Sequence, residues 1–579
     1  MERHCGDGSR KMFSSQARGQ LSDMPAFRRI QKPPAASGGR LIDPPITPSA
    51  DSPAASIETL VDNNRLLRAA FSTRIGDMKL WELIAATRRE VLTVAAEYSG
   101  SYRDVHRPKS MAEWIAQPIV MGGHQPELFH AGVWLKNSVL DAYARQLGGT
   151  AINLVIDTDR CARTSVDVPV GTPEQAHFEE VFFDLPAPEM AWEERGIIDA
   201  ECFAAFGRRA SDLLRPLEAE PMLRRWWPLA VERAGESHRL GLAIAQARHM
   251  LEERYGLETL ELPMSEMVRL PTVMVFIGWL LAHARLLHDA YNSGLAAYRA
   301  AHRERSLSRP MPDLVVRVDN PAEGDWLEIP WWIWSREDPR RRRAFANMST
   351  PGGMTISDME TLRVELPISA ETSPSKWVDA LSRMEEHGIR LRPRAIITTL
   401  LARLLVADVF VHGIGGAAYD QLTDEIVRRL TGCDPPRFAI VSGTLRLPIA
   451  AHYERRESLD PEAELAEVHR LLRDLEFHPE RHLAPLDSRP DTVRELVGDK
   501  WRWIETHPTV TLAKRRCREI RAANARLAVY TQPVRDELLA RVGPLAQAIR
   551  AQKVLASRAH PWCFFPEKTL KKFLLLETD

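Results

Sequence analysis

The sequence predicts an α/β protein in which helices cover a parallel sheet and a C-terminal coiled-coil arm follows; three observations lead to this prediction. Residues 119–156 have the order strand, helix, strand that is typical of parallel sheets. Residues 406–430 repeat the order strand, glycines, helix. Residues 455–555 are charged and carry leucines at helical spacing, which predicts two long antiparallel helices.

The first unit starts with a short apolar strand at residues 119–121, which leads into two glycines at residues 122–123. A helix is expected over about residues 126–147, because apolar side chains recur on one face and a proline suits the first helical turn. The second strand, residues 151–156, ends in Asp-Thr-Asp at residues 157–159.

The second unit has a helix at residues 394–405 and a strand at residues 406–411. The loop His-Gly-Ile-Gly-Gly at residues 412–416 then leads to a helix over about residues 418–430. Residues 438–442 are expected to form a further core strand.

Composition divides the chain into three regions. Residues 1–55 are rich in Ser, Pro, Gly and Arg, which predicts a disordered leader. Residues 56–450 are expected to hold the core, with a mainly helical insertion at about residues 175–310. Residues 451–579 are expected to form the helical arm.

Charge and cysteine usage exclude several classes of function. Lys and Arg total 77 against 78 for Asp and Glu, which argues against a dedicated nucleic-acid binder. The basic cluster at residues 340–343 is interpreted as a solvated face rather than a polyanion site. No paired cysteines or His-Glu-x-x-His motif indicate a metal, and no long apolar stretch indicates a membrane span. We expect a cytoplasmic protein.

Gly122, Gly123, His124 and Gln125 form the first candidate site. Glycines after a strand bring bare backbone near a ligand, and a following helix points N–H groups at a phosphate or carboxylate. His124 would donate to a phosphoryl oxygen or exchange a proton near neutral pH. The alternative interpretation is a satisfied loop histidine beside an ordinary turn.

His412, Gly413, Gly415 and Gly416 form the second candidate site. They match neither a P-loop nor the Gly-x-Gly-x-x-Gly pattern. Ligands of open parallel sheets lie beyond the carboxyl ends of the strands, where such loops converge. We therefore predict that both glycine loops lie at one sheet edge and build one ligand site.

Three further features carry open alternatives. Asp157 and Asp159 end a strand, where they would bind a ribose, an amine or a metal ion, or simply form a solvated strand exit. The aromatic run at residues 326–334 is interpreted as core and sheet face rather than a ligand cage. Polar groups of a helix at residues 291–302 would face either the site or solvent, and solvent is the expectation.

Several motifs resemble those of the bacillithiol synthase family, the cysteine-adding enzymes of bacillithiol biosynthesis. The family stretch Gly-Gln-Gln-x-Gly-Leu-Phe is similar to residues 123–129, and its Pro-Arg-Ala-Leu helix start is similar to residues 393–396. Its Val-Gly-Gly-Pro-Gly-Glu-x-x-Tyr loop resembles residues 411–419, and its Asp-His-Asp resembles residues 157–159. The general likeness covers about residues 115–575.

Three positions depart from the family pattern. His124 replaces a glutamine, Thr158 replaces the central histidine and Gly416 replaces the loop glutamate. Exchanging polar groups in a site usually changes what fits there.

The resemblance implies a Rossmann-like core and a carbon–nitrogen ligase-like enzyme that joins an amino acid, cysteine for example, to an amine of a small sugar-like acceptor. A nucleotide, ATP or ADP, would bind at the glycine loops. His124 and His412 would act as ligand donors or acid–base groups, Asp157 and Asp159 would orient the amine or ribose, and Arg394 or Tyr419 would clamp an anion. The alternative is a non-catalytic ligand-binding or scaffold protein, and in either case the C-terminal helices are the expected surface of a homodimer.

Overall fold

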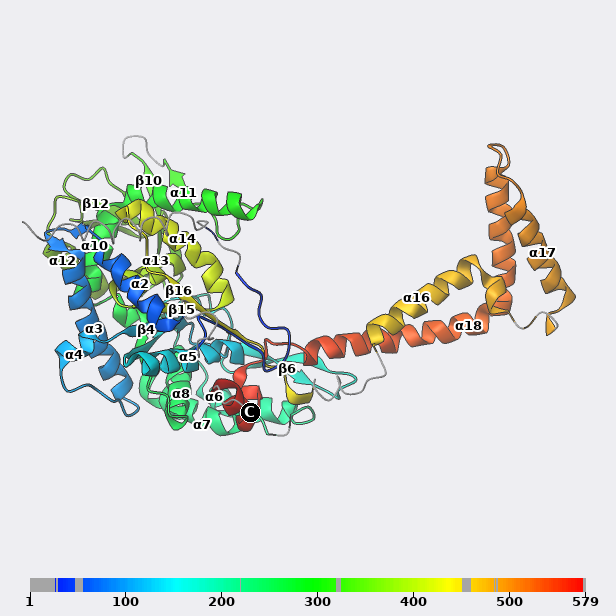
Figure 1. Ribbon diagram of the computed structural model, residues 1–579, viewed down its shortest axis with the longest axis horizontal. Coiled ribbons are helices and arrows are strands. Elements are labelled where there is room, and N and C mark those ends of the chain that lie inside the picture. Colours follow the sequence, from blue (N-terminus) through cyan, green and yellow to red (C-terminus); the bar gives the residue numbers. More distant parts are fainter. Residues whose placement is uncertain are drawn as a thin grey trace, which may run out of the picture.

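The computed structural model describes residue 27 and residues 30–46, 56–218, 220–318, 324–449, 460–483, 485 and 488–575. It shows a mixed α/β body from which three C-terminal helices extend (Figure 1).

A six-stranded sheet lies at the centre of the body. Its strands, in spatial order, are β1 (Arg40–Asp43), β16 (Phe438–Gly443), β15 (Val409–His412), β4 (Ile119–His124), β5 (Thr150–Val155) and β8 (Leu260–Pro263). All neighbouring pairs are parallel except β1 with β16. Val411 lies opposite Gly122, so both glycine loops lie at the same edge of one sheet, as predicted.

Helices cover both faces of this sheet. Side chains alternate along each strand, so each strand offers apolar residues to both faces. Ile119 and Met121 of β4 belong to one apolar cluster, and Val120 belongs to the other. The first cluster includes side chains of α3 (Leu80–Gly100), α10 (Pro271–Ala282), α11 (Ala284–His302), α12 (Pro374–Glu386) and α13 (Ala395–Leu405). The second includes α2 (Ile57–Ala69), α5 (Ala131–Leu147), α6 (Ala200–Leu214), α7 (Leu223–Ser237) and α8 (Leu240–Arg254).

A second sheet is antiparallel and supplies one wall of the site described below. Its strands, in spatial order, are β13 (Arg363–Leu366), β12 (Met354–Ser357), β11 (Arg342–Asn347), β10 (Trp326–Ser335) and β14 (Ile389–Pro393), with β9 (Val316–Arg317) also beside β10. Trp326, Trp331 and Trp334 are buried, as expected for core and sheet-face residues, whereas Trp332 of the same run lines the cavity described below. The body also contains two strand pairs, β2 (Arg74–Ile75) with β3 (Met78–Lys79) and β6 (Ser165–Val170) with β7 (His177–Phe182). Its further helices include α4 (Met111–Ala116), α9 (Met264–Met267) and α14 (Ile414–Thr431).

Two expectations about the regions of the chain need correction. Residues 40–43 of the supposed leader form β1, because their backbone pairs with the edge strand β16. The remainder of residues 1–29 apart from Phe27, and residues 47–55, lie outside the described residues. The segment at residues 175–310 is mainly helical, but it also supplies β8 to the central sheet.

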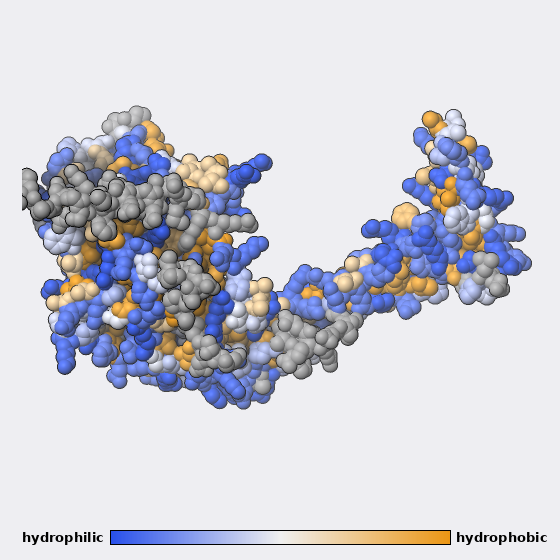
Figure 2. Space-filling model, viewed as in Figure 1, coloured by the Kyte–Doolittle hydropathy of each residue, from blue (hydrophilic) through white to orange (hydrophobic). Residues whose placement is uncertain are grey.

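The C-terminal helices are α16 (Pro461–Phe477), α17 (Asp491–Glu505) and α18 (Ala513–Leu555), and Figure 1 shows them reaching away from the body. We call them the helical extension. Val468 and Leu475 of α16 pack against Leu538 of α18. Apolar side chains also appear among the polar ones on its surface (Figure 2). The start of the predicted arm, residues 451–459, lies outside the described residues.

The chain returns to the body after α18, so the last part of the predicted arm belongs to the core. Trp562 is buried and its ring lies 4.3 Å from that of Trp134 and 4.6 Å from that of Trp226, centroid to centroid. The final helix, α19 (Glu567–Leu574), buries Leu570 and Phe573 in the same apolar cluster.

Within the described residues, no single helix is both long and apolar enough to cross a membrane. The bent pair α10 and α11, which meet at 79°, passes that test of length and composition only when the two are taken together.

Candidate functional site

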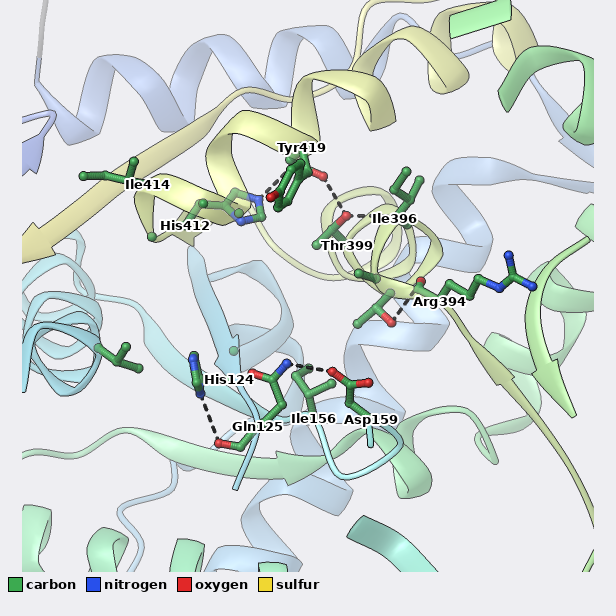
Figure 3. A pocket seen from close by; sticks show the side chains of 18 of the residues that line it. His124, Gln125, Ile156, Asp159, Arg394, Ile396, Thr399, His412, Ile414 and Tyr419 are labelled. Carbon is green, nitrogen blue, oxygen red and sulfur yellow. Dashed lines mark hydrogen bonds and ion pairs between the residues drawn. The ribbon is translucent and has the colours of Figure 1, made fainter. Parts of the chain in front are cut away.

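A cavity of about 830 Å³ opens where β4, β5 and β15 end, and Figure 3 shows part of its lining. Its volume lies within the range of small-molecule sites, ~300–1,000 Å³. It is lined by most of the residues singled out from the sequence: Gly123, His124, Gln125, Asp159, Arg394, His412, Gly413, Gly415, Gly416 and Tyr419. Gly122 and Asp157 are not part of its lining. Both glycine loops therefore border one space.

Gly122 and Gly123 lie inside β4 and not in a turn after it, which corrects the expectation for this loop. Both pair with β5, where Gly123 lies opposite Leu154. A Cβ atom on Gly123 would lie 2.9 Å from the carbonyl oxygen of Leu154, so glycine permits the close approach of these strands. The following helix starts only at Ala131, so its N-terminus does not directly follow His124.

His124 is the last residue of β4 and borders the cavity (Figure 3). Its Nδ1 lies 3.1 Å from the main-chain oxygen of Gln125, and its ring meets that of Phe129 edge-on. Burial, followed by the charge of Lys136, lowers the pKa of His124 to about 3. The neutral ring is therefore the favoured form near pH 7, and it can donate or accept a hydrogen bond.

His412 ends β15, and its Nε2 lies 2.8 Å from Oδ2 of Asp420 on α14. Asp420 also accepts hydrogen bonds from Thr399 Oγ1 at 2.6 Å and from Arg403. Burial acts to raise the pKa of Asp420, but Arg403 and His412 hold it well below its ordinary value. Burial lowers the pKa of His412 although Asp420 opposes the effect. An ionised Asp420 only accepts, so we assign the imidazole proton to Nε2 and the lone pair to Nδ1.

The start of α14 presents bare backbone to the cavity. Gly413 is its N-cap, and Gly415 and Gly416 lie in its first turn. No atom lies within 4 Å of a Cβ built on Gly413 or Gly415. A helix N-terminus in open space favours an anion. A Cβ on Gly416 would lie only 2.8 Å from His412 Nδ1, so the histidine ring occupies the room that glycine leaves. Tyr419, on the same helix, is 46% exposed.

The two acids after β5 have different roles. Asp157 is 1% exposed and accepts hydrogen bonds from Ser265 N at 2.9 Å and from Ser265 Oγ, so it fastens β5 to the start of α9 and does not reach a ligand. Asp159 faces the cavity, where it accepts from Gln125 Nε2 and Arg341 Nη1, each at 2.7 Å. Burial acts to raise the pKa of Asp159, but Arg341 and Gln125 keep it below its ordinary value.

Two cations at the α5 side of the cavity were missed in the sequence. Lys136 Nζ donates to the main-chain oxygen of Gly123 at 2.9 Å. Burial and the nearby Arg248 lower the pKa of Lys136 to about 8. Arg558 reaches the cavity from the segment after α18 and donates to the main-chain oxygen of Gly443 at 3.0 Å.

The opposite wall comes from the second sheet and corrects two interpretations. The cluster at residues 340–343 is not simply a solvated face, since Arg341 has a side chain only 7% exposed and both it and Arg343 line the cavity. Tyr291 of α11, expected to face solvent, is buried and also lines the cavity. Trp332 completes this wall.

Comparison with known proteins adds no relative. No family model matches the chain, and no curated protein matches it. Within the described residues, no group of three or more His, Cys, Asp or Glu side chains is arranged to hold a metal ion.

Proposed function

We propose that the chain is a carbon–nitrogen ligase-like enzyme that binds a nucleotide, or another anion, at the glycine loops of this cavity. One observation carries the proposal: five cationic side chains line the cavity, namely Lys136, Arg341, Arg343, Arg394 and Arg558. The lining carboxylates are Asp159 and Asp420, and both already have cationic partners. The remaining positive charge favours an anionic ligand.

The topology supports a Rossmann-like core. Numbered in chain order, the parallel strands β8, β5, β4, β15 and β16 follow the order 3-2-1-4-5 across the sheet. In such sheets the ligand crevice lies where the order reverses, here between β4 and β15. The cavity borders both of these strands. The packing of α16 against α18 likewise supports a coiled-coil arm.

His412 is the candidate general base for the ligase step. When an amine nitrogen forms a bond to a carboxyl carbon that the nucleotide has activated, the nitrogen loses a proton. The bond from that carbon to the activating phosphate oxygen breaks, and the phosphate-bearing group leaves with this oxygen. His412 Nδ1 would take that proton, and Asp420 would stabilise the imidazolium that results. Lys136 would contribute positive charge near the phosphate-bearing ligand.

A non-catalytic ligand-binding or scaffold protein is the second candidate. It is favoured by the three departures from the family motifs, at His124, Thr158 and Gly416. The dimer that this alternative includes is supported by Val529, Tyr530 and Leu539, which α18 exposes.

Calorimetric titration with ADP and ATP tests the shared first step. The wild type should bind at least one of them, and Lys136→Met should weaken binding about tenfold, the equivalent of ~1.4 kcal/mol. Arg160, which is exposed and outside the cavity, provides the matched control Arg160→Met with unchanged affinity. Absence of nucleotide binding by the wild type would refute the nucleotide part of the proposal.

Mass spectrometry separates the two candidates. The full chain is incubated with ATP, a mixture of amino acids and glucosamine, and amide products are sought. The ligase proposal expects a product whose formation is abolished by His412→Gln. Nucleotide binding without any product, unchanged by His412→Gln, would favour the binding protein.

A further inference from the structure

The wall opposite the glycine loops holds an unusual arrangement around Trp332. The guanidinium carbon of Arg341 lies 4.6 Å from the centre of the indole ring, and that of Arg394 lies 4.4 Å from the same ring. Cation–π contact of this kind is strongest on tryptophan. Trp332 on β10 thus holds two arginines from different elements against one surface.

Carboxylates hold both arginines in place. Arg341 Nη1 donates to Asp159 at 2.7 Å, and Arg394 Nη2 donates to Glu328 at 2.8 Å. Glu328 is 1% exposed and also pairs with Arg343 at 3.5 Å. The main-chain N–H of Arg394 donates to Pro330 O at 3.0 Å, which ties this residue to β10. The guanidiniums are therefore held in place before a ligand arrives.

The arginines on this wall retain the capacity to bind an anion. Its three guanidiniums, Arg341, Arg343 and Arg394, face two carboxylates, Asp159 and Glu328, so a single positive charge is left over. The Nε atoms of Arg341 and Arg394 are buried and have no hydrogen-bond partner among the described residues.

We propose that Arg341, Arg394 and Trp332 form a clamp for the carboxylate of a small substrate, the amino acid in the proposed ligase reaction. This inference rests on the proposed function for the identity of the substrate but not for the clamp itself. A carboxylate offers two oxygens to the planar guanidinium fork, and its single negative charge equals the charge left over. A phosphate carries more charge, and it would be better served by Lys136 and Arg558, for which no ion pair occurs among the described residues.

The position of the clamp gives the substrate a direction. Figure 3 shows the Arg394 side chain extending away from His124 and His412. Asp159 links Arg341 to Gln125, so the clamp adjoins the β4 loop through this carboxylate. A substrate held by its carboxylate at the clamp would point its remaining atoms back toward His412 and the start of α14.

Paired ligands test the clamp directly. L-cysteine and L-cysteine amide differ only in the carboxylate, and their binding to the full chain is measured by calorimetry. The wild type should bind the acid about tenfold or more tighter than the amide, because a charge-assisted hydrogen bond is lost with the amide. Arg341→Gln should remove this preference, and Arg341→Lys should retain part of it.

Arg340→Gln is the matched control, since Arg340 is adjacent in sequence, 61% exposed, and outside the cavity. It should keep the full preference for the acid. Arg341→Lys also guards against unfolding of the Gln variant, because it keeps a cation beside Asp159.

ADP and inorganic phosphate distinguish a failure of the clamp from a failure of the proposed function. Arg341→Gln should leave ADP and phosphate affinity within about twofold of the wild type, while Lys136→Met should lower it. Equal binding of acid and amide by the wild type would overturn the clamp, as would a larger loss for phosphate than for L-cysteine in Arg341→Gln. Preference for the acid without any ADP binding would retain the clamp and refute the nucleotide site.

Discussion

The two glycine loops look alike in sequence but differ in structure. At β4, the glycines lie within the strand and the helix starts at Ala131, after an intervening loop. At β15, the strand ends at His412 and α14 starts at Ile414. Gly123 is packed against a neighbouring strand, whereas Gly413 and Gly415 border open space.

This difference shows that one residue type serves two physical needs within a single site. The β4 glycines permit backbone to approach backbone, which is a requirement of folding. The α14 glycines keep side chains away from a helix N-terminus, which is a requirement of ligand access. Substitutions should therefore affect stability at β4 and ligand binding at α14.

The largest expected effect is on stability at β4. Gly123→Ala places a Cβ 2.9 Å from Leu154 O, and this contact with backbone should lower the free energy of unfolding by about 1–3 kcal/mol. Gly413→Ala meets no atom within 4 Å and should leave it unchanged. Urea denaturation of both variants measures the difference. Equal stability of the two variants would contradict the proposed difference between the two glycine loops.

The two histidines should show the reverse of the glycine pattern, with the loss of stability at His412 and the loss of ligand binding at His124. His412→Ala removes a buried hydrogen bond to Asp420 and should lower the free energy of unfolding by about 1–2 kcal/mol. His124→Ala should melt nearly like the wild type but bind nucleotide more weakly, by about 1–3 kcal/mol for one lost hydrogen bond. Thermal melting and ADP titration on each variant provide the test. If His124→Ala melts several degrees lower yet binds ADP normally, His124 is a structural residue.

Anion binding should depend on pH through Lys136 beside β4. Burial holds the pKa of Lys136 at about 8, so the cation is present below that pH and is lost as the pH rises through it. ADP affinity should fall above pH 8 by up to about tenfold per unit, because one proton is lost with the charge. Titrations from pH 6.5 to pH 9.5 measure this slope. Lys136→Met should show weaker binding and no such fall; an identical slope in that variant would assign the titration to another group.

The smallest expected effect concerns the first turn of α14. Gly415→Ala meets no atom within 4 Å and replaces a poor helix former, so stability should rise by up to about 1 kcal/mol. Ligand affinity should fall slightly, since the methyl group faces the cavity. A loss of stability in this variant would show that Gly415 is packed like Gly123.

Local sequence patterns predicted the sheet well where signals were continuous. The predicted strand at residues 438–442 corresponds to Phe438–Gly443, and the predicted helix at residues 394–405 corresponds to Ala395–Leu405. Both are apolar runs with clear boundaries. The start of α5 was misplaced because Pro126 fits an irregular loop as well as it fits a first helical turn. Residues 40–43 were missed because pairing with β16 overrides a weak local preference.

The site was predicted only in part because several of the residues that line it lie far from the glycine loops in the sequence. The strand ends at His124 and His412 gave a local signal through their glycines. Arg341 lies in a basic cluster that was interpreted as a solvated face, and Arg558 gave no local signal, since tertiary folding alone brings both to the cavity. Lys136 did offer a signal, as a cation within the apolar stretch Val-Trp-Leu-Lys-Asn-Ser-Val-Leu. A buried lysine in such a stretch is unusual without a functional or pairing role.

The return of the chain into the body has a mechanical consequence for the cavity. Helix α18 has 43 residues and a contour length of about 64 Å, at 1.5 Å per residue. The segment that follows α18 is anchored in the body by Trp562, and Arg558 lies between Trp562 and the end of the helix. Displacement grows with distance from a pivot, so a tilt of a few degrees sweeps the far tip through several ångströms. The same tilt would barely move Arg558, so a rigid-body tilt of the helical extension would leave the shape of the cavity unchanged.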